Sequence, residues 1–335
     1  DEIDRLLDPK VLTNFKRIDI KGEHKITEIK PTDNLIIKGN NLLVLHSLKK
    51  KFAGKIKLIY IDPPYNTGND EFGYNDNFNH STWLTFMKNR LEVAWSLLRE
   101  DGAIFISIDH NELGHLKVLM DEIFGPENLK NIVTVQRSAI SGPKVINPGL
   151  VNVSEFLLIY AKSSKWDFNR IFRERKYDNR YNKFIKNLGH GYERWEFSSV
   201  LDEFSKKLNI PKSKLRKKLG KAYDGKLLDF IIEHIDHIIR FANLDERSIS
   251  KEALKIKEES IKNPRKLYLL KREGFEDYYV RNGQVILFYK NRVMKINGKT
   301  SPFEPVSDIW NDVLPNDLHN EGGVKLRKGK KPEKL

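Results

Sequence analysis

The fold prediction for this 335-residue chain starts from Ile59–Gly68, whose sequence is IYIDPPYNTG. The residues leading into it, from Lys57 to Ile61, are mostly apolar and rich in β-branched and aromatic side chains, which predicts a strand buried on both faces. Asp62 follows at the carboxyl end of that strand, which is where ligands bind in open α/β sheets. The stretch therefore predicts an α/β fold with a ligand site beside Asp62.

The loop after this strand offers hydrogen-bond acceptors rather than donors. Pro63 and Pro64 have no backbone N–H, which leaves the Asp62 carboxylate and the Pro63 carbonyl as its polar groups. Two rigid acceptors side by side suit an amino group, and Tyr65 adds a flat face for stacking a planar ring. We therefore expect a pocket for the exocyclic amine of a flipped-out base. The plainer alternative is a turn that ends a buried strand.

A strand–turn–helix pattern precedes this stretch. Residues Asn34–Ile37 are expected to form a strand, and the helix expected over Asn41–Lys50 carries leucines along one side. Together with the strand before Asp62 they form a βαβ unit, which predicts a parallel sheet. Asn40 lies at the carboxyl end of the first strand, where it could contact a ligand or simply cap the helix.

Regular apolar spacing predicts the elements that follow. Apolar residues recur every three or four positions from Trp83 to Leu98, which predicts a helix capped by Ser81 or Thr82. The apolar run Ala103–Ile108 predicts another buried strand, with Asp109 at its carboxyl end. The remaining expected elements of this region are a helix over 111–124 and strands over 131–136 and 155–162.

Positive charge is concentrated in one internal block. Residues 163–300 hold 33 Lys and Arg against 19 Asp and Glu, whereas the rest of the chain holds 27 of each. Such a localised excess is typical of a nucleic-acid surface, the alternative being a solvated basic face. Within the block we expect helices over 199–208 and 213–242 and a hairpin or meander over 277–296. The candidate DNA-binding residues here are Arg170, Arg173, Arg175, Lys176 and Arg180.

These patterns divide the chain into an N-terminal segment (1–33), an α/β region (34–162), a basic α+β region (163–300) and a tail (301–335). The absence of cysteine excludes disulfides and thiolate metal sites. No apolar run approaches the roughly 20 residues of a membrane span, and no secretory signal is visible, so we expect a cytoplasmic protein. The spacing of the nine histidines predicts no metal site.

The stretch Asp62–Gly68 resembles motif IV of the beta-group amino-methyltransferases, in the form typical of DNA adenine-N6 enzymes. The whole string is most similar to the modification (Mod) subunit of type III restriction–modification systems. Trp83, the pair Arg90-Leu91, the run Asp101–Asp109 and the tail around Lys331-Pro332 also match that family.

The resemblance implies a Rossmann-like methyltransferase sheet that methylates adenine N6 in duplex DNA, with S-adenosylmethionine as cofactor. It implies a homodimer that works with a restriction (Res) subunit, and no membrane. It further implies that 34–162 is the catalytic region, that 163–300 is an inserted target-recognition domain and that 301–335 returns to the catalytic domain. Catalysis would fall to Asp62, Pro63, Pro64 and Tyr65. Cofactor contacts would come from Asn40, Asp62, Lys331 and Pro332, and DNA contacts from Asn66 and Thr67.

One part of the family's pattern is missing. The glycine-rich cofactor loop should follow an apolar strand, yet the sole Gly-x-Gly of the chain, Gly189–Gly191, lies in the basic block without such a strand. We therefore expect a truncated chain whose sheet lacks its central cofactor strand and leaves an edge unpaired. Two alternatives stay open: a DNA-binding fragment without catalytic activity, and a methyltransferase acting on RNA or on a protein amide.

Overall fold

The computed structural model describes residues 12–30, 32–67, 78–138, 140, 149–246, 249–296 and 298–311. The chain divides into two compact units, Asp1–Asn169 with Ser307–Leu335, and Arg170–Val306. The inserted segment expected over 163–300 thus falls mostly in the second unit. None of the described helices is both long and apolar enough to span a membrane.

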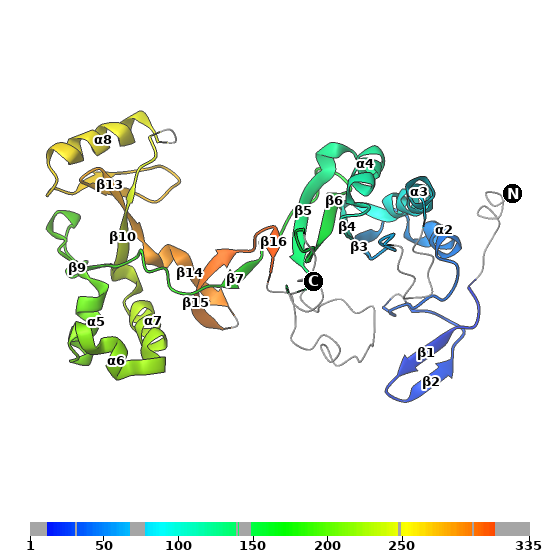
Figure 1. The fold of residues 1–335 in the computed structure, drawn as a ribbon, viewed down its shortest axis with the longest axis horizontal. Coiled ribbons are helices and arrows are strands. Elements are labelled where there is room, and N and C mark those ends of the chain that lie inside the picture. The colour runs from blue at the N-terminus through cyan, green and yellow to red at the C-terminus, as the bar shows by residue number, and fades with distance from the viewer. Residues whose placement is uncertain are drawn as a thin grey trace. The chain divides into compact units, whose positions relative to one another are not determined.

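The first unit contains a five-stranded mixed sheet in the order β16-β5-β6-β4-β3 (Figure 1). Its strands are β3 (Ile56–Ile61), β4 (Leu98–Ile108), β5 (Leu129–Gln136), β6 (Ser154–Ala161) and β16 (Ile309–Trp310). β3 is parallel to β4, and β16 is parallel to β5, whereas β6 is antiparallel to both of its neighbours. A separate hairpin is formed by β1 (Lys16–Asp19) and β2 (Gly22–Lys25).

The α-helices among the described residues of this unit are α2 (Asn41–Phe52), α3 (His80–Leu97) and α4 (Leu113–Phe124). The apolar stripe of α3 packs with α4 against one face of the central strands. Trp83, Leu91, Ile104 and Ile106 are completely buried in this core. A smaller cluster on the opposite face joins Val133 and Leu157 to Trp310, which anchors the returning tail to the sheet.

Most elements expected in this unit are present, and several expectations were wrong. The strand before Asp62 was expected to be buried on both faces, yet Leu58 and Tyr60 are 57% and 45% exposed, because β3 is the edge strand of the described sheet. The sheet was expected to be parallel, yet β6 is antiparallel to both of its neighbours.

Residues 34–37 form no strand, because β3 has no partner on its outer edge among the described residues and Ile36 is 97% exposed. A strand is stable only when its backbone amides and carbonyls are paired by a neighbour. The cap of α3 is Asn79, whose side chain accepts the Thr82 N–H, rather than Ser81 or Thr82.

The described part of the second unit contains two antiparallel sheets and four α-helices, with short 3-10 helices between them (Figure 1). The six-stranded sheet has the order β11-β12-β13-β10-β8-β9, and the three-stranded sheet has the order β14-β15-β7. The strands are β7 (Phe172–Glu174), β8 (Lys183–Ile185), β9 (Phe197–Ser199), β10 (Ile238–Asn243), β11 (Tyr268–Leu270), β12 (Tyr278–Arg281), β13 (Gln284–Phe288), β14 (Val293–Ile296) and β15 (Lys299–Pro305). The helices are α5 (Val200–Leu208), α6 (Leu215–Leu219), α7 (Tyr223–Glu233) and α8 (Lys251–Lys262).

The expected hairpin near residue 282 is present as β12 and β13. Asn282 and Gly283 both have positive φ angles, of 47° and 72°, as a two-residue type I′ turn requires. The long helix expected over 213–242 was wrong at its end, because residues 238–243 form strand β10. This strand pairs with β13 and β8, and Ile238 and Ile239 are buried. Pairing with distant strands therefore overrides the local helical pattern.

The core of the first unit leads to a stability prediction. Replacing Trp83 by Phe removes the indole N–H that donates to the Pro64 carbonyl over 2.9 Å, and it leaves a space in a fully buried position. We expect the free energy of unfolding to fall by about 2–4 kcal/mol. Trp95→Phe, at a 41% exposed site on the same helix, should cost less than about 1 kcal/mol. Equal losses in urea titrations of both variants would contradict this assignment.

Candidate functional site

The loop at the carboxyl end of β3 is fixed by side chains from other elements. The Pro64 carbonyl accepts a hydrogen bond from the Trp83 indole at the start of α3. Asp62 is exposed, whereas Pro63, Pro64 and Tyr65 are half-buried. Within the described part of the chain no hydrogen bond engages the Pro63 carbonyl. The loop therefore presents an accessible carboxylate next to a carbonyl acceptor, as its sequence predicts.

Tyr65 lies against the core and shares the site with two carboxylates. Its ring packs against the α3–α4–β4 core, and its hydroxyl donates to Glu155 on β6 over 3.1 Å. Burial raises the pKa of the Tyr65 phenol well above its usual range, and the negative charges of Asp62 and Glu155 raise that pKa further. The phenol is therefore a neutral hydrogen-bond donor at physiological pH. The structure thus brings Asp62 and Tyr65 together and adds Glu155, which no local pattern identifies.

Asn66, at the end of the described part of this loop, is hydrogen-bonded to Phe78 and Glu112. Its backbone is left-handed, with φ of 57°, a conformation that Asn tolerates better than most residues. Its amide nitrogen donates to the Phe78 carbonyl over 2.9 Å, and its amide oxygen accepts the Phe78 N–H over 2.7 Å. The same amide nitrogen donates to Glu112 over 2.6 Å. Asn66, expected to contact DNA, is therefore bonded to Phe78 and Glu112, while Thr67 is exposed.

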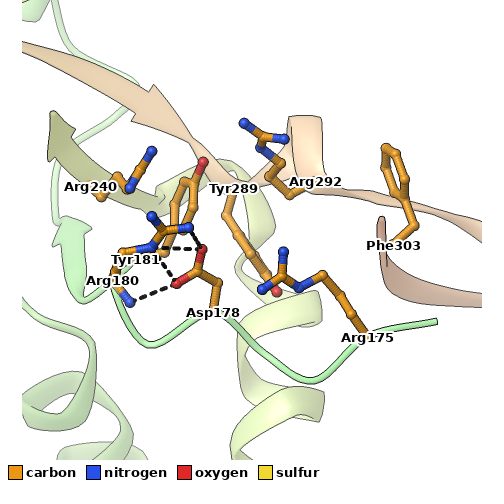
Figure 2. A pocket seen from close by; sticks show the side chains of 8 residues that line it. All are labelled: Arg175, Asp178, Arg180, Tyr181, Arg240, Tyr289, Arg292 and Phe303. Carbon is orange, nitrogen blue, oxygen red and sulfur yellow. Dashed lines mark hydrogen bonds and ion pairs between the residues drawn. The ribbon is translucent and has the colours of Figure 1, made fainter. Parts of the chain in front are cut away.

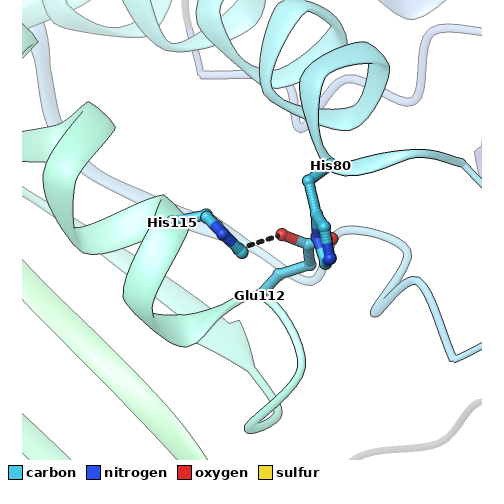
Figure 3. Close-up of side chains that lie close together, drawn as sticks. All are labelled: His80, Glu112 and His115. Carbon is cyan, nitrogen blue, oxygen red and sulfur yellow. Dashed lines mark hydrogen bonds and ion pairs between the residues drawn. The ribbon is translucent and has the colours of Figure 1, made fainter.

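The carboxylate of Glu112, just before α4, is buried and accepts several hydrogen bonds (Figure 3). His80 and His115 donate to it through Nδ1, over 2.7 Å and 3.1 Å, in addition to Asn66. The ligand-type atoms of His80, Glu112 and His115 lie within 4.8 Å of one another, so these residues could hold a metal ion. Sequence spacing did not pair them, because His80 and Glu112 are 32 residues apart.

Two other residues expected at this edge of the sheet accept hydrogen bonds from residues that follow them in the chain. Asn40 accepts the N–H groups of Leu42 and Leu43 at the start of α2, which matches the helix-cap alternative. Asp109 is buried and accepts the backbone and side-chain N–H groups of Asn111. Lys331 and Pro332, expected to contact the cofactor, lie outside the described residues.

The basic candidates all lie in the second unit, and three of them form ion pairs there. Arg173 and Arg175 pair with Glu304 on β15, and Arg180 pairs with Asp178. Arg170 and Lys176 are exposed. Their expected contacts with DNA remain predictions.

The chain was also compared with known proteins. A family model described as DNA methylase matches residues 56–335, more than half of the chain. The match begins at β3, so it includes the Asp62 loop and the helices that hold this loop in place.

Two curated relatives are type III Mod subunits by name. The "Probable type III restriction-modification enzyme HindVI Mod subunit" of Haemophilus influenzae is 39% identical over 366 residues, covering 100% of this chain and 48% of the relative. The EcoP15I Mod subunit of Escherichia coli is 36% identical over 184 residues, covering 44% of this chain and 28% of the relative. This chain thus spans about half the length of the first of these relatives.

Among solved structures, an M1.HpyAVI–SAM complex matches 42% of this chain and 60% of its own, with 16% identity and a TM-score of 0.30. The family assignment therefore rests on the sequence matches. By the extent of the family-model match, which includes the Asp62 loop, this chain belongs to the DNA methylase family.

Proposed function

We propose that this chain is the catalytic part of a type III Mod subunit that methylates adenine N6 in duplex DNA. The observation that carries the proposal is the loop Asp62–Tyr65, which offers an exposed carboxylate and a carbonyl beside an aromatic ring. The 39% identity to a relative named as a Mod subunit supports the choice of substrate. The same resemblance supports a Res subunit as partner and a homodimer.

The two acceptors of the loop, the Asp62 carboxylate and the Pro63 carbonyl, could activate an amine that is otherwise a poor nucleophile. The lone pair of adenine N6 is delocalised into the ring, so the amine must be held in a geometry that localises it. Hydrogen bonds donated by N6 to the Asp62 carboxylate and to the Pro63 carbonyl would do this and would fix the direction of attack. Tyr65 would support the flipped base by stacking, an interaction worth about 1–3 kcal/mol per base.

S-adenosylmethionine would supply the electrophilic methyl group. The described residues do not by themselves form a site for this cofactor. The side-chain oxygen of Asn40 already caps α2, and no glycine-rich loop follows a strand in the described ranges. The proposed roles are therefore confined to the residues that hold the base.

The proposal predicts that Asp62 is essential. Asp62→Ala in the full-length protein should lower transfer of tritiated methyl groups to DNA by at least about 100-fold, because one of the two acceptors is lost. Asp101→Ala is the matched control. Asp101 is an aspartate near the amino end of β4 that pairs with Lys57 and Arg99. Equal incorporation by wild type and Asp62→Ala would remove Asp62 from the mechanism, and nucleoside analysis should identify the product as N6-methyladenine.

A second prediction separates the ring of Tyr65 from its hydroxyl. Tyr65→Phe keeps the aromatic face and loses the hydroxyl, which is hydrogen-bonded to Glu155 and to Asp62, so kcat/KM should fall less than about 10-fold. Tyr65→Ala loses the face as well and should lower kcat/KM by about 10- to 100-fold. Similar losses in both variants would show that the hydroxyl, and not stacking, is the important group.

A third prediction concerns the hydrogen bonds that Asn66 forms with Phe78 and Glu112. Asn66→Gly keeps the left-handed backbone favourable but removes the bonds to Phe78 and Glu112. We expect methyl transfer to fall by about 10- to 100-fold, because the acceptors are no longer held in place. Asn282→Gly makes the same change at a left-handed turn position of the second unit, and methyl transfer should be unchanged. Full activity of Asn66→Gly would contradict the positioning role.

A further inference from the structure

The second unit contains a pocket whose lining is dominated by arginine (Figure 2). Its volume is about 60 Å³, which is several times the roughly 10–15 Å³ that a cavity needs to hold one water molecule. The lining residues come from the segment after β7, from β10, from the turn after β13 and from β15. They are Arg175, Asp178, Arg180, Tyr181, Arg240, Tyr289, Arg292 and Phe303.

The charges around this pocket do not balance. Arg180 pairs with Asp178 over 2.7 Å, and Arg175 lies 3.6 Å from Glu304, which also pairs with Arg173. In the ranges that the structure covers, neither Arg240 nor Arg292 has a carboxylate partner. Guanidinium groups placed together repel one another unless an anion lies between them.

Two buried polar atoms of the pocket also lack partners. Of the buried side-chain nitrogen and oxygen atoms in the described residues, three make no hydrogen bond, and two of these are Arg240 Nε and the Tyr289 hydroxyl. Tyr289 is only 1% exposed. A buried polar atom without a partner costs about 1–3 kcal/mol, so native proteins usually supply one. Both atoms can donate a hydrogen bond.

Tyr289 is held rigidly, with its buried hydroxyl beside the Asp178 backbone and near Arg175. Its ring packs against Tyr177 and Tyr181, with centroid distances of 5.3 and 4.8 Å. Burial raises the pKa of its phenol to about 12, so the hydroxyl keeps its proton at physiological pH. The Arg240 guanidinium lies 5.2 Å from the centre of the Tyr181 ring. In Figure 2 the Tyr289 hydroxyl points toward Arg175, whereas Arg240 lies on the side of the Tyr181 ring and Arg292 lies away from the hydroxyl.

We propose that this pocket binds a phosphate oxyanion between the guanidinium groups that line it, with Arg240 and Arg292 as the members without an acidic partner and with Tyr289 beside Arg175. A phosphate group offers several acceptor oxygens and negative charge, which complements the fixed guanidinium donors and the unpartnered hydroxyl. Its source is either a backbone phosphodiester of DNA or a free phosphate. The first source rests on the proposed function, and the second does not.

The first experiment needs no DNA and no methylation activity. Inorganic phosphate, titrated against chloride at equal ionic strength, should raise the midpoint of thermal unfolding of the full chain by about 2–4 °C. Arg292→Gln, at an exposed position, should abolish this rise, and Arg265→Gln, an exposed arginine of the same unit outside the pocket, should keep it. Tyr289→Phe should reduce the rise. In phosphate-free buffer it should leave the protein as stable as wild type or more stable, because an unpaired hydroxyl has been removed.

The second experiment identifies the source. If a DNA phosphate binds here, the slope of log binding constant against log salt should become less steep by about 0.9 in Arg292→Gln, because one phosphate contact is lost. An unchanged slope together with phosphate-specific stabilisation would assign the pocket to a free phosphate. Stabilisation by phosphate in a protein without methyltransferase activity would leave the proposal standing. No phosphate-specific stabilisation together with an unchanged slope would overturn it.

Discussion

The loop after β3 contains two successive prolines, so the groups that fix it must come from other elements. The Trp83 indole at the start of α3 holds the Pro64 carbonyl, and Asn66 is tied to Phe78 and to the buried Glu112 before α4. Both helices are themselves placed by the apolar core that they share with β4. The position of the exposed Asp62 therefore depends on helix packing as much as on the strand that precedes it.

Local sequence was sufficient for the elements whose own pattern is strong. The apolar periodicity of α3, the continuous apolar runs of β4 and β6 and the Asn282-Gly283 turn each predicted an element that the structure contains. The Asp62–Tyr65 loop was predictable for the same reason, because its chemistry is contiguous along the chain. Residues 34–37 and 238–243 were predicted wrongly, since the presence of a strand there is decided by neighbours that are distant in sequence.

The support around the site could not be predicted in this way. Tyr65 and Glu155 are 90 residues apart, and Asn66 and Glu112 are 46 residues apart. Each pair joins a loop residue to a buried carboxylate, and no spacing rule connects them. Buried carboxylates that accept several hydrogen bonds are stable only in the assembled fold. The sequence thus identifies the groups that would face a substrate but not the groups that hold them.

In the second unit, too, the sequence identifies charged residues but not the partners that neutralise them. A charge count over 163–300 treats every arginine alike, yet Arg173, Arg175 and Arg180 are partly neutralised by Glu304 and Asp178. Arg240 and Arg292 are not among the candidate DNA-binding residues between Arg170 and Arg180, and they have no acidic partner in the described ranges. Water weakens the ion pairs of exposed side chains. A buried donor without an acceptor costs free energy, so the buried Nε of Arg240 favours an anionic ligand. Fixed charge that is left uncompensated at a pocket is thus a sharper indication of an anionic ligand than the net charge of the segment around it.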